Sequence, residues 1–319
     1  MEYKHIPVML EEAIENLNIK LGGFYVDCTL GGAGYTTRIA SLVGSKGRVL
    51  ATDLDSLAIK NAEARLKKEK LKNVIIVKDN FRNLAKILDE NTEFKNKKID
   101  GIVFDLGLSS AQLDDRNRGI SFKYDTPLDM AFETTDDGEM NKRTSRIVNK
   151  WRIEHIEKIL KDYGEEPFAR RIAKLITMAR RKKPIETTGQ LVEIIKKAIP
   201  PKLQNAKIHF ATRTFQALRI ATNEELESLT EVLPQAIEAL AEGGRCVVIS
   251  YHSLEDRIVK DYFKQESQDC ICDSKQMMCS CNHEKKIKII NKKVIPPTEA
   301  EIKNNPRARS AKMRVIEKI

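Results

Sequence analysis

The sequence predicts an α/β protein in which a parallel sheet is interrupted by an inserted, all-helical subdomain. Three observations support this prediction. Short apolar segments alternate with helical patterns in the first third of the chain, which is typical of βαβ units and a parallel sheet. The alternation disappears between residues 121 and 207, where only helical patterns occur. An apolar segment, Arg245–Ser250, then follows a further helical run from Glu224 to Leu240, so the sheet is expected to continue after the insertion.

The elements follow from local patterns in order along the chain. After Pro7, apolar residues recur at helical spacing and predict a short amphipathic helix. The expected strands lie at 24–30, 48–53, 73–77 and 100–105. The helices expected between them lie at 36–43, 56–69 and 82–88. The insertion predicts three helices bounded by glycine and proline, near 145–162, 165–181 and 188–198. Two β-like segments end the chain, at 286–290 and 311–316.

We therefore expect two domains. Residues 1–120 and 208–319 would form a discontinuous sheet domain, and residues 121–207 an inserted helical subdomain that binds the substrate. The chain has 319 residues, which is enough for this arrangement.

The composition favours a polyanionic partner. The chain carries 56 basic and 46 acidic residues, a formal net charge of +10, so nucleic acid is the first candidate. No apolar run approaches the length of a membrane span, and the N-terminus lacks the layout of a signal peptide. We expect a cytoplasmic protein with no membrane partner, in which the six cysteines stay reduced.

A glycine-rich turn follows the first expected strand and gives the sheet a Rossmann-like character. It contains Gly31, Gly32 and Gly34, and the second strand ends on Asp53, 53 − 34 = 19 residues later. That interval is close to the ~20 residues at which an acid reads a nucleoside ribose. The glycines lack the G-x-G-x-x-G order of dinucleotide enzymes. Asp27, just before the turn, suits a cationic ligand, and S-adenosylmethionine has an ammonium, a sulfonium, a ribose and no pyrophosphate.

Two alternatives to this interpretation stay open. The turn is also compatible with a tight strand–helix connection that binds no ligand. A nicotinamide or other nucleotide oxidoreductase is the second alternative, which the glycine spacing and Asp27 oppose.

Polar residues end several of the expected strands, where ligands bind in open α/β sheets. These strand ends are Asp27, Asp53, Asp79-Asn80-Phe81, Asp105 to Ser110, and Ser250 to Ser253. A rim of carboxylates at one crevice fits a ligand with ribose hydroxyls, an adenine amine and an ammonium.

Together, these features and a set of longer motifs resemble the bacterial 16S rRNA (cytosine N4) methyltransferases, the RsmH/MraW family. The motifs that carry the resemblance begin at His5, Asp27, Asp105, Pro127, Tyr163, Ala211, Ile249 and Asn305, in family order along nearly the whole chain. The resemblance implies a Rossmann-like methyltransferase sheet. It implies a substrate cytidine in the decoding region of 16S rRNA, with the 30S subunit as partner. The residues that it implies for binding S-adenosylmethionine are Ala33, Gly34, Tyr35, Asp53, Phe81, Asp105 and Gln112.

Two positions depart from the family pattern. Tyr35-Thr36 stands where the family usually has His-Ser, which would preserve a backbone contact but lose one made by an imidazole. Ala131 stands where the family usually has arginine, so one phosphate or cofactor contact is in doubt.

The cysteines argue against methylation at carbon 5 of cytosine, which needs a thiolate nucleophile. Cys28 and Cys246 lie at or in strands, without the Pro-Cys loop of carbon-5 enzymes. Transfer to an exocyclic amine needs only an acceptor that holds and orients that amine. Asp105, followed by Ser109 and Ser110, is placed for that role or for the cofactor.

His252 is the second catalytic candidate, because it could orient the base or receive the released proton. The alternative is a structural histidine beside a helix N-cap, Ser253, with Asp256 closing the capping box.

Basic clusters lie away from the strand ends. Segment 167–183 has basic residues and no acid, and the tail has further lysines and arginines. They predict phosphate contacts or, alternatively, solvated helix faces. Arg116 and Arg118 are expected to meet a flipped-out nucleotide.

Two C-x-C motifs lie close together near the end of the chain, and they contain Cys270, Cys272, Cys279 and Cys281. Tetrahedral zinc is one interpretation, but the usual spacing is C-x2-C, so a reduced loop or a redox-labile hairpin is favoured, with no metal expected. The sequence also leaves three questions open. The protein could be a non-catalytic ribosome-assembly factor, and the substrate could be naked rRNA or the assembled subunit. The oligomeric state is also open, with a homodimer as one alternative.

Overall fold

The computed structural model describes residues 7–108, 112–113, 115, 118–133, 143–204, 208–273, 276 and 278–319. The chain divides into two compact units. The sheet unit comprises Met1–Gly107 and Leu226–Ile319, and the helical unit comprises Leu108–Glu225. Among the described residues, no helix has both the length and the apolar character needed to cross a membrane.

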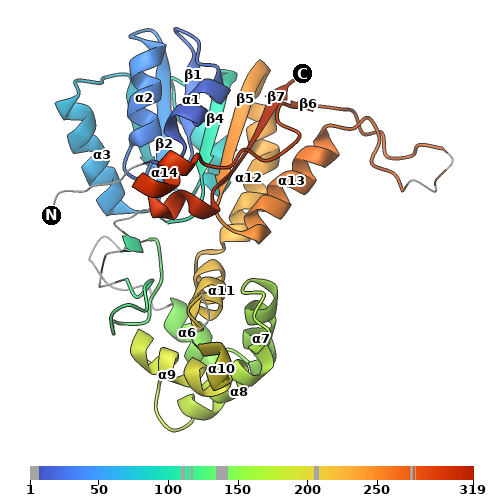
Figure 1. Ribbon diagram of the computed structural model, residues 1–319. Coiled ribbons are helices and arrows are strands. Elements are labelled where there is room, and N and C mark those ends of the chain that lie inside the picture. The colour runs from blue at the N-terminus through green and yellow to red at the C-terminus, as the bar shows by residue number, and fades with distance from the viewer. Residues whose placement is uncertain are drawn as a thin grey trace. The chain divides into compact units, whose positions relative to one another are not determined.

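The sheet unit is built on seven strands in the order β3-β2-β1-β4-β5-β7-β6 (Figure 1). Their bounds are β1 Phe24–Asp27, β2 Arg48–Asp53, β3 Val74–Lys78, β4 Ile99–Asp105, β5 Leu240–Ser250, β6 Ile287–Ile289 and β7 Lys312–Lys318. The first five strands pair in parallel, and β7 is antiparallel to both β5 and β6. The predicted α/β fold with a parallel sheet and a helical insertion is confirmed. From β1 the chain adds strands β2 and β3 on one side, and it then returns to add β4 and β5 on the other side of β1. Open α/β sheets bind ligands at this switch point between β1 and β4.

Helices cover both faces of this sheet. Their bounds are α1 Leu10–Leu17, α2 Gly34–Val43, α3 Ser56–Lys68, η1 Phe81–Asn83, α4 Leu84–Glu90, α12 Glu225–Ala239, α13 Ser253–Glu266, α14 Glu299–Asn304 and η2 Pro306–Ser310. Successive strand residues point to opposite faces, so Ile102 packs with α4, α12 and α13, whereas Val103 packs with α1 and α2. Burial on both faces explains why the strands are almost continuously apolar.

The helical unit has its own apolar core. Its helices are α6 Arg143–Lys150, α7 Ile153–Asp162, α8 Ala169–Arg180, α9 Thr188–Ala198, α10 Pro201–Gln204 and α11 Thr212–Asn223. Phe215 and Leu218 of α11 pack into this core, so the unit extends beyond the interval 121–207. A substrate-binding role for that interval stays a prediction.

Several predicted boundaries were wrong. The strand expected at 24–30 ends at Asp27, and the strand expected from Arg245 begins at Leu240. The helix expected at 145–162 is two helices, because Arg152 adopts an extended conformation between them. The helix expected from 165 begins at Ala169, since Pro167 disfavours a helical conformation in the residue before it.

Candidate functional site

Asp27, at the end of β1, holds the glycine-rich turn together from inside. Its side chain is fully buried, and its carboxylate accepts hydrogen bonds from the Thr36 hydroxyl at 2.6 Å and the Thr29 N–H at 3.1 Å. Burial raises the pKa of this carboxyl, and the two threonines act in the opposite direction. The carboxylate is therefore engaged within the protein, which gives Asp27 a supporting role and not the direct ligand contact that its sequence position suggested.

The turn itself is tight and approaches its neighbours closely. Gly31 and Ala33 both have left-handed backbone conformations, with φ of 46° and 57°. Gly34 opens α2, and a Cβ built there would lie 2.6 Å from Pro7 Cγ, so no larger residue fits without a shift. The backbone N–H groups at the start of α2 thus lie at the switch point of the sheet.

Asp53, at the end of β2, is tied to the same turn. Its two carboxylate oxygens accept hydrogen bonds from the N–H groups of Gly31 and Asp55, each at 2.9 Å. Burial raises the pKa of Asp53 to about 6, while these two hydrogen bonds lower it. A carboxylate held in this way beside a glycine turn is suited to accept hydrogen bonds from sugar hydroxyls.

Asp105 and Tyr251 lie together at the ends of β4 and β5. The Tyr251 hydroxyl donates to Asp105 Oδ1 at 2.6 Å, and the Asp105 N–H donates to Thr29 Oγ1 at 2.7 Å. Burial raises the pKa of Asp105 to about 7, and the bond from Tyr251 lowers it. The neighbouring placement of the Asp105 and His252 strands is confirmed, since β4 and β5 pair in parallel with Asp105 opposite Ile249.

His252 caps helix α13, which corrects the capping scheme predicted from the sequence. His252 is itself the N-cap, and the box is closed by Glu255, whose carboxylate accepts the His252 N–H at 3.2 Å. Ser253 is the first residue of the helix, and Asp256 instead pairs with Arg314 at 2.7 Å. The Nδ1 atom of His252 accepts the Glu255 N–H at 3.4 Å, and Nε2 lies 3.1 Å from Glu255 Oε1.

Tyr35 and Phe81 have structural partners as well as predicted ligand roles. The buried Tyr35 hydroxyl donates to the Val8 carbonyl, so this residue anchors the segment before α1. The tyrosine found in place of a family histidine therefore acts through its packing, and only its backbone is left to a ligand. Phe81 is partly buried and packs edge-on against Phe104, with ring centroids 5.9 Å apart.

The remaining predicted residues belong to the helical unit. Gln112 is buried there, and its assignment to the cofactor stays a prediction. Arg118 is also buried, paired with Asp115 at 3.1 Å and bonded to the Phe132 carbonyl at 3.0 Å, so it is engaged internally and not displayed for a nucleotide. Ala131, at the family arginine position, is buried. His5, Ser109, Ser110 and Arg116 lie outside the described residues.

The basic segment of α8 also divides by role. Arg180 donates to the Val148 and Trp151 carbonyls, at 2.8 and 2.6 Å, and thereby binds the end of α6. Arg181, Lys182 and Lys183 are exposed and continue beyond the helix. These three, together with the exposed Arg170 and Lys174 of α8, are placed to meet a polyanion.

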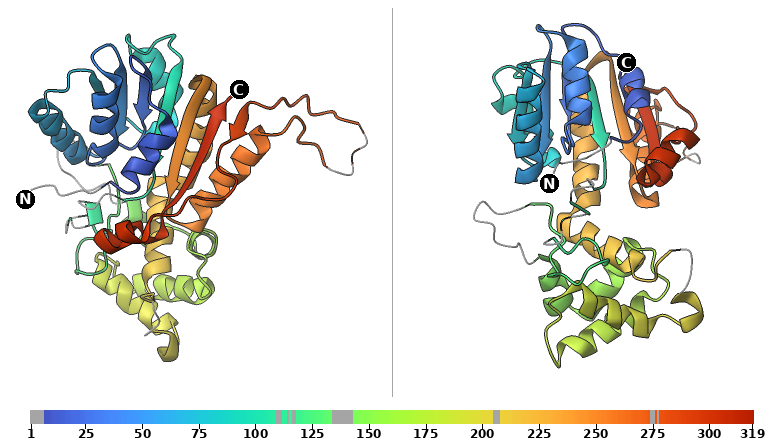
Figure 2. Two further views of the ribbon diagram at one scale, coloured as in Figure 1. Left: turned by 45° about the horizontal axis from the view of Figure 1, so that its top comes forward. Right: turned by 60° about the vertical axis from the view of Figure 1, so that its left-hand side comes forward.

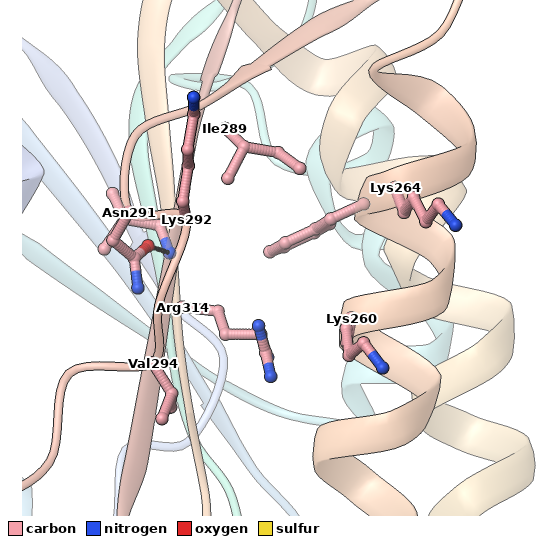
Figure 3. A pocket seen from close by; sticks show the side chains of 9 residues that line it. Lys260, Lys264, Ile289, Asn291, Lys292, Val294 and Arg314 are labelled. Atoms are coloured by element: carbon pink, nitrogen blue, oxygen red, sulfur yellow. Dashed lines mark hydrogen bonds between the residues drawn. The ribbon is translucent and has the colours of Figure 1, made fainter.

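A basic pocket of about 320 Å³ lies between α13 and the β6–β7 edge of the sheet unit (Figure 3). Lys260 and Lys264 line it from α13, while Lys292 and Arg314 line it from the opposite side. Arg314 is neutralised by Asp256, so the three lysines carry the net positive charge of the pocket. Its lining shares no residue with the group Asp27, Asp53 and Asp105.

Sequence reasoning did not predict the hydrogen bonds that Tyr251 makes with the Asp105 carboxylate and that Thr29 and Thr36 make with the Asp27 carboxylate. Thr29 and Thr36 could have been found from the sequence, because each lies within two residues of a glycine of the turn. Tyr251 stood in a recognised strand-end motif, but nothing local indicates its partner.

Comparison with known proteins agrees with the resemblance found in the motifs. The pattern of the MraW methylase family matches residues 2–319. A protein named ribosomal RNA small subunit methyltransferase H, from Clostridium botulinum (strain Kyoto / Type A2), is 48% identical over the full length of both chains. The protein of the same name from Clostridioides difficile (strain 630) is 47% identical, also over both full lengths.

Among solved structures, an rRNA methylase from Streptococcus thermophilus aligns with 97% of this chain and 95% of its own, at 11% identity and a TM-score of 0.43. The likeness to that structure is distant, whereas the agreement in sequence extends over the whole chain. The chain belongs to the MraW methylase family.

Proposed function

We propose that this protein methylates N4 of a cytidine in the decoding region of 16S rRNA, with S-adenosylmethionine as methyl donor. Membership of a methylase family supports the reaction class, and the names of the full-length relatives support small-subunit rRNA as the substrate. The observation that carries the proposal is the pairing of Asp53 with the glycine turn at the switch point, beside a strand that ends on Asp105.

The cofactor site would use groups that the sheet unit presents along one edge. In this proposal, Asp53 accepts the ribose hydroxyls, and the backbone at Ala33, Gly34 and Tyr35 approaches the cofactor at the start of α2. Phe81, the first residue of η1 after β3, would offer its ring to the adenine. The family resemblance also assigns Gln112 to the cofactor. Bound there, the cofactor supplies a methyl group activated by a sulfonium.

The chain's own chemistry favours an amine as acceptor. Cys28 and Cys246 are buried, and burial raises the pKa of both thiols, so neither is a ready nucleophile for attack on carbon 5. An exocyclic amine attacks the methyl carbon directly, the carbon–sulfur bond breaks, and one proton leaves the nitrogen. Asp105, with a pKa of about 7, is matched to hold that amine and accept its proton at a carboxylate oxygen.

Tyr251 and His252 are then positioning candidates at the neighbouring strand end. The Tyr251 hydroxyl fixes one oxygen of Asp105, which leaves the other oxygen to the substrate. His252 is anchored by its capping box, and in this proposal its ring orients the base.

RNA would be held through phosphates by the exposed lysines and arginines. We assign this role to Arg181, Lys182 and Lys183 after α8, and to the lysines of the basic pocket. Such contacts are sequence-independent and fix the position of the RNA.

The decisive experiment is nucleoside mass spectrometry of 16S rRNA from a strain that lacks this protein. Loss of N4-methylcytidine, with return on complementation, is the expected result. Purified protein should also transfer labelled methyl from S-adenosylmethionine to 30S subunits or to naked rRNA, and this comparison identifies the substrate form. Unchanged modification in the deletion strain would refute the proposal, and a purely structural assembly factor would show no transfer in either assay. Calorimetric binding of NAD in place of S-adenosylmethionine would favour the oxidoreductase alternative.

A further inference from the structure

Four cysteine thiols meet at one point on a hairpin that follows α13. The hairpin leaves the end of α13, extends away from the sheet and returns as β6 (Figures 1 and 2). The Sγ atoms of Cys270, Cys272, Cys279 and Cys281 all lie within 4.8 Å of one another. The separation is 3.6 Å for Cys270–Cys279, 3.6 Å for Cys279–Cys281 and 3.8 Å for Cys281–Cys270.

These separations match the edges of a tetrahedral metal site. A Zn–S bond of about 2.3 Å gives sulfur–sulfur edges of about 3.8 Å, since a tetrahedron's edge is about 1.63 times its centre-to-corner distance. A disulfide would bring two sulfurs to about 2.05 Å, which none of the three separations approaches. Iron–sulfur clusters place their thiolates on different irons and need a wider spread of sulfurs. The geometry therefore selects a single ion with four thiolate ligands.

Backbone groups around the thiols favour their ionised form. The Ile271 N–H donates to Cys281 Sγ, and the Ser280 N–H donates to Cys272 Sγ, both at 3.4 Å. Such outer-shell hydrogen bonds orient metal ligands and stabilise the negative charge on sulfur. His283 does not join the group, because its Nε2 contacts the Gln265 carbonyl at 3.2 Å and ties the base of the hairpin to α13.

The described part of the hairpin is held by few polar contacts and by no apolar core. Its apolar residues Ile271 and Met278 are exposed, so no apolar core orders the described part of the segment. A metal ion commonly replaces a core in a segment of this size.

We infer that Cys270, Cys272, Cys279 and Cys281 bind one structural Zn²⁺ ion, which fixes the hairpin between α13 and β6. The C-x-C spacing that argued against zinc in the sequence is compatible with it in three dimensions. The four Sγ atoms meet although each pair has only one residue between its cysteines. The site is independent of the candidate methyl-transfer site and of the proposed function.

Metal content tests the inference directly. Untagged protein, purified without chelators and dialysed against metal-free buffer, should retain about one zinc per chain by plasma mass spectrometry. Cobalt substitution should give the intense visible absorption of a tetrahedral thiolate site. The variants Cys272→Ser and Cys279→Ser should each lose most of the zinc. Ser280→Ala leaves all four thiols and the Ser280 N–H in place, and Cys246→Ala removes a cysteine outside the group, so both should keep it.

Proteolysis gives a second readout that does not depend on activity. Chelation with a strong zinc ligand should speed tryptic cleavage at Lys285 and Lys286, while the circular dichroism of the sheet and helices stays unchanged. The inference would be overturned if the wild-type protein held no zinc after reconstitution. It would also be overturned if Cys246→Ala lost as much zinc as Cys272→Ser and Cys279→Ser. Two intact disulfides within the hairpin, found by mass spectrometry of protein purified under reducing conditions, would overturn it as well.

Discussion

The Tyr251 hydroxyl lies 2.6 Å from Asp105 Oδ1 and joins the ends of two neighbouring parallel strands. This bond stabilises the ionised carboxylate, whereas burial favours the protonated form, and the balance leaves the pKa of Asp105 at about 7. Small changes at this pair should therefore alter the proposed reaction near neutral pH.

Tyr251→Phe removes the hydrogen bond and should raise the pKa of Asp105 further. We expect the pH profile of the single-turnover methylation rate to move upward by about 1–2 units, since a hydrogen bond to a charged group contributes about 1.5–3 kcal/mol. Tyr262→Phe, the same chemical change on α13, should leave the profile in place. A profile that moves equally in both variants would mean that Tyr251 does not tune Asp105.

Asp105→Asn should change stability in a pH-dependent way. The folded-state pKa of about 7 lies above the ordinary value of 3.8, so the folded protein keeps a proton that the unfolded chain releases between these values. Wild-type stability contributed by this group thus falls as the pH rises from about 4 to 7. Asparagine does not titrate, so the variant lacks this loss of stability. Between about pH 4.5 and pH 8, its free energy of unfolding should therefore rise by on the order of 1–4 kcal/mol relative to that of the wild type. Urea unfolding at both pH values measures the difference, and the same relative stability at both would contradict it. The variant should lack methyl transfer.

Asp53→Asn should weaken binding of S-adenosylmethionine by about 1–3 kcal/mol, because the ribose hydroxyls lose a charged acceptor. Asparagine can still accept a hydrogen bond from Gly31, so the turn should keep its shape. Titration calorimetry measures the dissociation constant, with Glu63→Gln on α3 as the exposed control. An unchanged constant would remove Asp53 from the cofactor site.

His252 combines a capping role with a proposed chemical one, and two substitutions separate them. His252→Asn retains a good N-cap acceptor, whereas His252→Ala should cost about 1 kcal/mol of stability. If the imidazole orients the base or handles the proton, both variants should methylate roughly 10- to 1000-fold more slowly in single turnovers, with cofactor affinity little changed. Full activity of His252→Asn would restrict His252 to the cap.

Reversal of Arg181, Lys182 and Lys183 to glutamate should weaken binding to 30S subunits. The dependence of the binding constant on salt should also flatten, because fewer counterions are released. Arg180 stays unchanged in this variant, since its guanidinium bonds to the carbonyls of Val148 and Trp151 and its loss would disturb the fold. Lys67 and Lys68 of α3, reversed in the same way, serve as the control. Equal affinity and slope in wild type and variant would make the triplet a solvated helix end.

Local patterns predicted the sheet and the strand-end acids well. Asp53 and Asp105 were found because each ends an apolar run, and the run and its end are adjacent in the sequence. Tyr251 was missed as a partner because 146 residues separate it from Asp105, and only the parallel pairing of β4 with β5 brings them together.

The errors in finer detail have comparable causes. Serine is a common N-cap, so Ser253 was preferred to His252, although the imidazole Nδ1 accepts the same kind of hydrogen bond. Arg118 and Arg180 were predicted to be exposed charges available to RNA. Both are instead bonded within the protein, and local sequence patterns do not indicate these partners.

The helical unit lies in the sequence between β4 and β5, two strands that pair with each other, and this has a consequence for synthesis of the chain. Ile99 of β4 faces Leu240 of β5, and the register then continues to Asp105 opposite Ile249. During translation the helical unit, Leu108–Glu225, is complete before β5 leaves the ribosome, and its contacts are local enough to form early. The central strand pair, and with it the bond between Asp105 and Tyr251, must wait for the last third of the polypeptide. We expect a purified chain truncated after residue 235 to protect the helical unit from protease while the first four strands stay susceptible, and a protected sheet at that length would refute this order of folding.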